Sequence, residues 1–151
     1  MADIYDVHDI VEIDKKGMTQ SLFRATIEDF EVIPKIRLPL TMKWSKAGKR
    51  YLSMKANLAY ELRRHFGFNR EKLDVLLSLS CAIHYKDRRK RDVDNSVGAI
   101  MDALQYADPS KGLEAIIEND HQIRELKKCN IFYDGKARLV IELRIYGGAL
   151  G

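Results

Sequence analysis

The chain has 151 residues and a formal net charge of +4, and 46% of its residues are hydrophobic and 32% are charged. This length suits one globular domain with its own core, and no apolar run approaches the roughly 20 residues of a membrane-spanning helix, so we expect no membrane protein. The charge is uneven: residues 1–31 carry eight acidic and three basic side chains, which leaves a net charge of about +9 on the rest of the chain. A basic body indicates a polyanionic partner.

The acidic beginning predicts a variable leader over residues 1–20, followed by one domain over residues 21–151. The leader is either a solvated arm or a mask over a basic surface. It lacks a basic start followed by an apolar segment, so we expect no signal peptide and a cytoplasmic protein. Cys81 and Cys129 lie in apolar runs without CxxC spacing, which predicts reduced core thiols.

Branched and aromatic residues predict extended structure at the start of the domain. Residues 21–30 and 31–40 both favour strands. Pro34 and Pro39 confine the second of these segments to a sheet edge or to strand ends.

A polar, basic loop over residues 41–50 precedes the clearest helix. Leucine and phenylalanine recur at helical intervals over residues 50–66, and Gly67 supplies a stop. The apolar run over residues 73–85 then predicts a buried central strand.

A second helix is predicted over residues 95–105, with Asp94 or Asn95 as its N-cap. Residues 107–112 break this helix. Residues 114–120 follow as a short extended piece.

Two further strands are predicted over residues 121–133 and 136–146. The Asp134–Gly135 pair between them is a strong signal for a hairpin. The chain is therefore expected to be a single small α+β domain, with a mixed β-sheet and two main helices on one of its faces.

Two carboxylates follow the central strand. If their segment is extended, Asp92 and Asp94 point the same way, roughly 7 Å apart along the backbone. Such a pair can converge on one hard cation with oxygen ligands. The best third ligand is Asp120, before the next strand. Both acids also fit purely structural roles, such as a helix cap.

A helix that begins near Asn95 places positions 94, 98 and 102 along one face, because residues four apart stack. Position 98 is glycine, so no side chain lies between Asp94 and Asp102 on this helix face. Asp102 is either part of the site or an ordinary surface residue.

Basic residues adjoin the acid pair. We predict phosphate contacts by a first group, Lys86, Arg88, Arg89, Lys90 and Arg91, and by a second group before the first helix, Lys43, Lys46, Lys49 and Arg50. Both groups also fit ordinary solvated charge. Carboxylates for a Mg²⁺ ion beside cations for phosphate are typical of a metal-dependent nuclease, which hydrolyses phosphodiesters with a metal-activated water.

The segment "RRKRDVDNSVGAIMDAL", followed by "IIENDHQI" and a closing hairpin, resembles the RusA family of Holliday junction resolvases. The resemblance covers roughly residues 32–147. It implies a RusA-like fold and a small homodimeric endonuclease that depends on Mg²⁺, with Mn²⁺ as an alternative. Such enzymes bind four-way DNA junctions in recombination and repair and nick two strands symmetrically, and phages and prophages often encode them.

The resemblance places the family's essential acids, as catalytic residues and metal ligands, at Asp92, Asp94 and Asp120. Residues that support the site are expected at Asn95, Asp102 and Asn119. The family commonly has a catalytic lysine where this chain has Gly98.

Either Lys90 or Lys86 substitutes for that lysine, or turnover is weaker, or this branch never required it. Many relatives have an aspartate in place of Asn119.

Two alternative functions remain. One is a branched-DNA-binding protein with weak or lost catalysis, and the other is a nuclease for flaps, forks or RNA.

Overall fold

The computed structural model describes residues 20–36 and 45–147. The predicted leader, apart from Gln20, and Lys43 lie outside these residues. In chain order the elements are β1 Ser21–Glu28, α2 Lys46–Phe66, β2 Leu77–Tyr85, α3 Val93–Leu104, the 3-10 turns η2 Pro109–Lys111 and η3 Asp120–Gln122, β3 Ile123–Tyr133 and β4 Arg138–Ile145.

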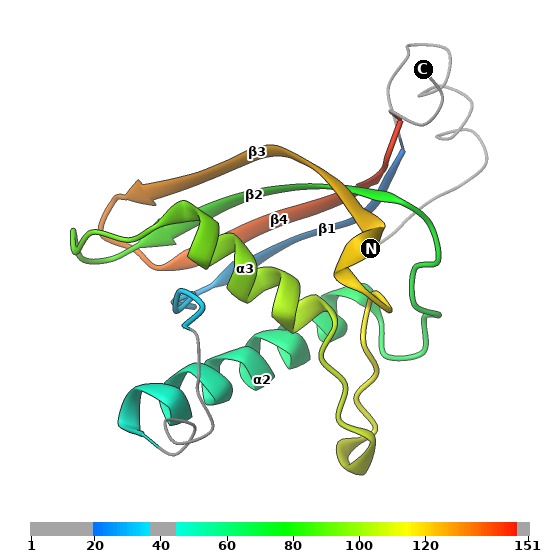
Figure 1. Ribbon diagram of the computed structural model, residues 1–151, viewed down its shortest axis with the longest axis horizontal. Helices are drawn as coiled ribbons and strands as arrows, with labels where there is room; N and C mark the ends of the chain where they lie inside the picture. The colour runs from blue at the N-terminus through cyan, green and yellow to red at the C-terminus, as the bar shows by residue number, and fades with distance from the viewer. Residues whose placement is uncertain (1–19, 37–44, 148–151) are drawn as a thin grey trace.

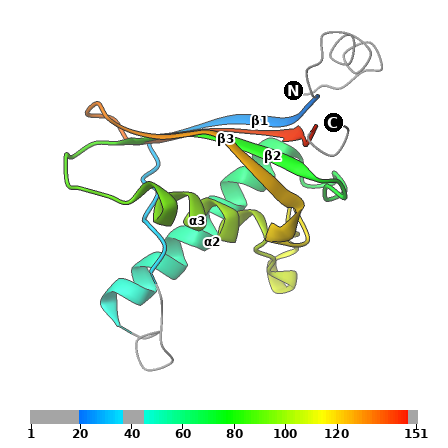
Figure 2. The same ribbon diagram turned by 45° about the horizontal axis from the view of Figure 1, so that its top comes forward.

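The four strands form one mixed sheet in the order β1-β4-β2-β3. β4 runs antiparallel to both β1 and β2, whereas β2 and β3 are parallel. Both helices lie on the same face of this sheet (Figures 1 and 2). The α+β class, the mixed sheet, the interior strand and the two helices on one face are confirmed. In the described part of the chain no helix is long and apolar enough to cross a membrane.

The core lies between the sheet and the helices. On α2 the buried positions follow a helical period, and they include Tyr51, Leu58, Leu62 and Phe66. The strand β1 alternates buried and exposed residues, as expected for a sheet that covers a core with one face only. Cys81 and Cys129 are free thiols that lie opposite each other in the pairing of β2 with β3.

The predicted hairpin is wrong. The turn at Asp134 and Gly135 does connect β3 to β4, and Gly135 has a positive φ of 84°. However, β2 lies between these two strands and pairs with both. A strand as apolar as β2 is most stable inside a sheet. The turn therefore connects β3 and β4 across the end of β2, which lies between them.

Helix starts and the second extended segment also differ from the prediction. α2 begins at Lys46, because the Ser45 side chain accepts a hydrogen bond from Gly48 N at 3.0 Å and caps the helix. α3 begins at Val93 with Asp92 as its N-cap, rather than Asp94 or Asn95. Residues 31–36, the described part of the second extended segment, contain no strand.

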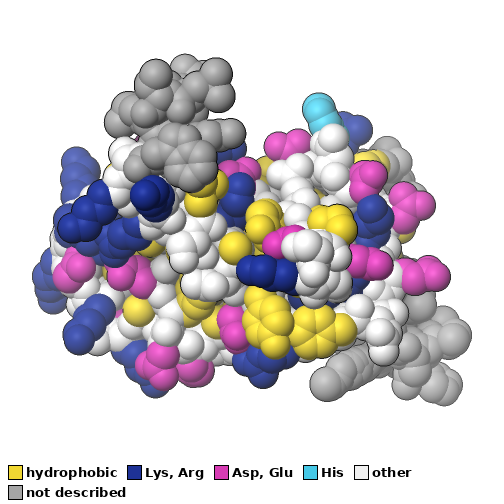
Figure 3. All heavy atoms as spheres, turned by 90° about the horizontal axis from the view of Figure 1, so that it is seen from below, with side chains coloured by type: hydrophobic (Ala, Val, Ile, Leu, Met, Phe, Trp, Pro, Cys, Tyr) yellow, Lys and Arg dark blue, Asp and Glu magenta, His cyan; other side chains and the backbone are white. Residues whose placement is uncertain are grey.

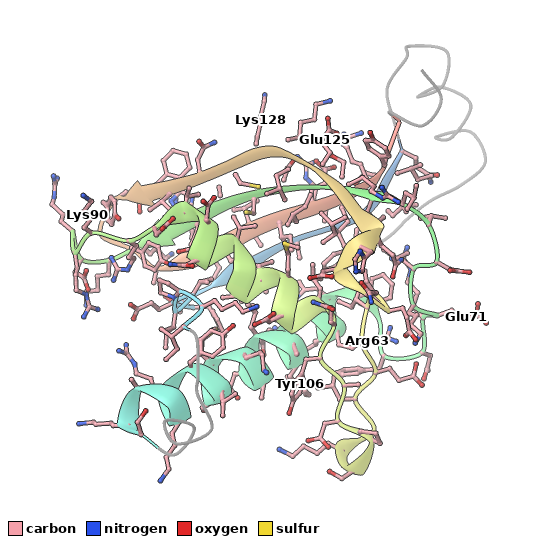
Figure 4. The ribbon with its side chains drawn as sticks, in the orientation of Figure 1. Arg63, Glu71, Lys90, Tyr106, Glu125 and Lys128 are labelled. Carbon is pink, nitrogen blue, oxygen red and sulfur yellow. The ribbon has the colours of Figure 1, made fainter. Side chains whose placement is uncertain are left out.

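Arg63 is the largest buried polar side chain and has 1% of its surface exposed. It donates to the carbonyls of Gly67 (2.8 Å), Arg70 (2.6 Å) and Glu114 (3.2 Å) and forms an ion pair with the Glu114 carboxylate. Burial lowers the pKa of its guanidinium. One side chain thus joins the end of α2 to two loops, and Figure 4 shows it at that place.

Replacing Arg63 with Met should lower the free energy of unfolding by roughly 2–4 kcal/mol, because three carbonyls lose their donor inside the protein. Urea denaturation measures this difference. Arg64→Met is the matched control, since Arg64 is exposed and pairs only locally with Glu61. Equal stability of the two variants would contradict the assigned role of Arg63.

Candidate active site

The acid pair lies at the start of α3. Asp92 has extended backbone angles (φ −88°, ψ 124°), and its Oδ1 accepts a hydrogen bond from Asp94 N at 2.9 Å. Asp94 is already in the first helical turn. Both side chains are exposed, and the positive end of the helix dipole favours negative charge there. The segment is therefore half extended and half helical, and the uniform extended spacing considered from the sequence does not apply.

The third predicted acid lies at the other end of the same helix. Asp120 N donates to Oε1 of Gln105, the residue that ends α3, at 3.2 Å. A helix of 12 residues spans about 18 Å, and Figure 1 shows η3 beside the end of α3 and far from its start. Among the described residues no three His, Cys, Asp or Glu side chains come together as a metal site. A single chain does not assemble the predicted acid cluster.

Asn119 has a clear local role. Its side chain accepts a hydrogen bond from His121 N at 2.8 Å, and Gln122 Oε1 accepts from the Asn119 N–H, which makes a capping box around η3. The amide thus fixes the turn that carries Asp120. It supports that acid through the backbone.

Asp102 is held by two contacts that the sequence did not predict. Tyr51 donates its hydroxyl to Asp102 Oδ2 at 2.7 Å, and Lys35 Nζ lies 3.1 Å from Oδ1. Burial first, and then the Asp102 hydrogen bond, raise the pKa of Tyr51. Lys35 N also donates to the Asn95 carbonyl at 2.8 Å. No spacing rule links residues 35 and 51 to position 102, so sequence reasoning had no signal for them.

A hollow of about 400 Å³ opens between the start of α3 and β3. Its lining includes Asp94 and Val97 from α3 and Leu126, Lys127 and Cys129 from β3. Leu126 is one of the most exposed large apolar side chains in the described residues. The hollow therefore combines a candidate acid, a cation and apolar surface.

Four members of the first basic group are exposed in the turn before α3: Lys86, Arg88, Arg89 and Lys90. Figure 4 shows Lys90 pointing outward at this end of the molecule. The turn is braced by Asp87, whose Oδ1 accepts from Arg89 N at 2.9 Å. That hydrogen bond first, and then Arg91, lower the pKa of Asp87.

Arg91 departs from its predicted role. Its side chain is 5% exposed and pairs with Glu31 at 3.2 Å and with Asp87 at 3.0 Å. The guanidinium also lies 3.8 Å from the centre of the Tyr85 ring. These contacts occupy Arg91 inside the fold, and we therefore assign it to the anchoring of the basic turn.

The second basic group lies near the first. Lys46, Lys49 and Arg50 are exposed on the first turns of α2. Arg50 approaches Glu31 at 3.8 Å, and Glu31 also pairs with Arg91. Figure 3 shows Lys and Arg side chains gathered at the left end of its face. The exposed members of the two groups form one basic end of the molecule beside the acid pair.

Comparison with known proteins gives a family. The model of "Endodeoxyribonuclease RusA" matches residues 29–144, a range that contains both basic groups and all the candidate acids. The crossover junction endodeoxyribonuclease RusA of Aquifex aeolicus (strain VF5) is 27% identical over 114 residues, which cover 74% of this chain and 83% of that relative.

Arg91→Gln should lower the free energy of unfolding by roughly 1–3 kcal/mol, because Glu31 loses a buried partner and Tyr85 loses its cation. Thermal or urea unfolding measures the change. Arg88→Gln, in the same turn but exposed, should leave the stability unchanged. If Arg91→Gln were as stable as Arg88→Gln, Arg91 would not be an anchor.

Proposed function

The chain belongs to the RusA family of endodeoxyribonucleases, and we propose that it resolves Holliday junctions by Mg²⁺-dependent hydrolysis of phosphodiester bonds. Mn²⁺ is the alternative cation, and the role is in DNA recombination and repair in the cytoplasm. The observation that carries the proposal is the exposed acid pair at the start of α3, directly after an exposed basic turn.

The acid pair has the right donor chemistry for the cation. Mg²⁺ prefers oxygen ligands, and Asp92 and Asp94 offer carboxylates on one helix turn. One Asp92 oxygen also accepts the Asp94 N–H, which orients that carboxylate. When bound, the cation would stabilise the charge that develops at the scissile phosphate. Two carboxylates are a partial ligand set, and a third ligand has to come from elsewhere.

A homodimer would supply that ligand. In a two-fold symmetric dimer whose α3 helices run antiparallel, Asp92 and Asp94 of one copy would lie beside Asp120 of the partner subunit. The edge strand β3 favours such an arrangement, because among the described strands it pairs with β2 alone and it exposes Leu126 beside the hollow at Asp94. Symmetry would create two equivalent sites, which suits two symmetric nicks.

The basic end of the molecule would hold the substrate. Lys86, Arg88, Arg89 and Lys90 would contact phosphates beside the acid pair, and the start of α2 would extend this surface through Lys46, Lys49 and Arg50. These contacts also offset the repulsion between DNA phosphates and the acids. Phosphate contacts position DNA and carry no base preference.

The second candidate function is a protein that binds branched DNA with weak or lost catalysis, or a nuclease for flaps and forks. Two observations support weak or lost catalysis. The described part of one chain holds only two of the three acids together, and position 98 is glycine where the family commonly has a catalytic lysine. The two candidates differ in cleavage, and the substrates differ in shape, so one assay with several substrates separates them.

Purified protein should make paired symmetric nicks in a labelled four-way junction with Mg²⁺ and none in a linear duplex of the same sequence. Chelator should abolish the nicks, and Asp94→Asn should slow them by at least about 100-fold because it removes a ligand carboxylate. Junction binding should persist in this variant, since one negative charge near phosphate is lost.

Asp74→Asn, an exposed acid outside the site, is the matched control and should cleave as the wild type does. Equal cleavage by wild type and Asp94→Asn would overturn the enzymatic proposal. Tight junction binding without nicks in any divalent cation would favour the binding protein, and preferred cleavage of flaps would favour the other nuclease.

A mixed dimer tests whether each site uses two subunits. Asp94→Asn and Asp120→Asn should each be inactive alone. A dimer with one copy of each, isolated through two different tags, should recover single nicks, because one of its two sites keeps Asp94 from one subunit and Asp120 from the other. If the mixed dimer stayed inactive, the three acids would not be shared in this way.

A further inference from the structure

Lys35 lies across the face of α3 that carries Asp94 and Asp102. Its backbone is fixed there by the hydrogen bond from Lys35 N to the Asn95 carbonyl at 2.8 Å. The preceding segment is also held, because Val32 is fully buried and its carbonyl accepts the Tyr85 hydroxyl at 2.6 Å. The position of Lys35 is therefore a property of the fold.

The aliphatic part of the Lys35 side chain crosses α3 at Gly98, which has no side chain in its way. A Cβ atom at position 98 would lie 3.3 Å from Lys35 Cδ, which is tighter than most carbon contacts, and 3.6 Å from Lys35 Cβ, which is an ordinary contact. The helix thus presents bare backbone where the stem crosses it. Any larger residue at position 98 would press on the stem.

The ammonium ends at a site built to hold it. Asp102 Oδ1 lies 3.1 Å from Lys35 Nζ, and the other Asp102 oxygen accepts the hydroxyl of Tyr51, which is 2% exposed. The Lys35 side chain is half exposed, and the Asp102 side chain is 22% exposed. The carboxylate is fixed from the protein side, while the cation faces the surroundings.

We infer that Lys35 supplies the cation that contacts the reacting phosphate over α3, with Asp102 and Tyr51 as its positioning residues. This inference rests on the proposed nuclease function. Positions 94, 98 and 102 share one helix face, so the lysine lies on the same stripe as the candidate ligand Asp94. Its flexible stem lets the ammonium move along this stripe.

Charge and exposure favour this role over a purely structural ion pair. A half-exposed ion pair is weak, so the ammonium can turn toward a phosphate oxygen at little cost while Asp102 still limits where it lies. Arg91, which also lies near the acid pair, is covered and paired with Glu31 and Asp87. A cation fixed near developing negative charge accelerates phosphoryl chemistry by electrostatic stabilisation.

The test uses Lys35→Met, which keeps an apolar stem over Gly98 and removes the ammonium. Single-turnover cleavage of a saturating four-way junction with Mg²⁺ should slow by about 10- to 100-fold. The junction Kd should change by less than about threefold, because many other phosphate contacts remain. The Tm should stay near that of wild type, and the exposed Lys111→Met is the matched control for loss of one lysine.

A relocated cation completes the test. Lys35→Ala removes the stem, and the double variant Lys35→Ala/Gly98→Lys returns an ammonium to the same stripe from the helix itself. The double variant should cleave at least about tenfold faster than Lys35→Ala.

Cleavage by Lys35→Met within about twofold of wild type would overturn the inference and leave the nuclease function intact. A loss of rate matched by an equal loss of binding or by a fall in Tm, with no recovery in the double variant, would assign Lys35 a structural role and also overturn it. A wild-type protein that never cleaves would overturn the function and the inference together.

Discussion

The parallel pairing of β2 with β3 determines where the candidate site residues lie. Parallel neighbours need a crossover, and here α3 provides it by running back along the sheet. The start of α3 must then follow the end of β2, and its last turn must lie near the beginning of β3. The acid pair and Asp120 flank this crossover, so the pairing that builds the sheet also separates the acids within one chain.

The same crossover explains the close contact between opposite charges. The turn from β2 into α3 is short, so its cations and the acids that begin the helix cannot lie far apart. The turn divides its cations between two environments: Arg91 packs on Tyr85 and pairs with Glu31, while the four other basic side chains face solvent. One buried arginine therefore holds an exposed cationic surface in place, and a flexible tail of like composition would not direct charge in this way.

Local signals in the sequence predicted the elements, and pairing between distant segments escaped them. Helical spacing identified α2 and α3, and apolar content identified β2. The N-cap of α3 was displaced to Asp92 because several neighbouring polar residues can cap a helix. The Asp134–Gly135 turn was recognised, but a turn does not reveal that another strand enters between its two arms. For the site, the acid pair and the exposed turn were visible in the sequence. The contact of Lys35 with Asp102 joins residues 67 positions apart and exists only in the folded chain.

The first turn of α2 contains no acidic residue, whereas Lys46, Lys49 and Arg50 begin the helix. Cations at the positive end of a helix dipole are repelled by it and by one another, and the exposed Arg50–Glu31 pair offsets this repulsion only in part. Ser45 satisfies one backbone donor there and cannot neutralise charge. A polyanion bound there would relieve this repulsion between the cations and the helix dipole. DNA bound at the start of α2 would therefore stabilise this end of the helix, and the relief of repulsion would contribute to the free energy of binding.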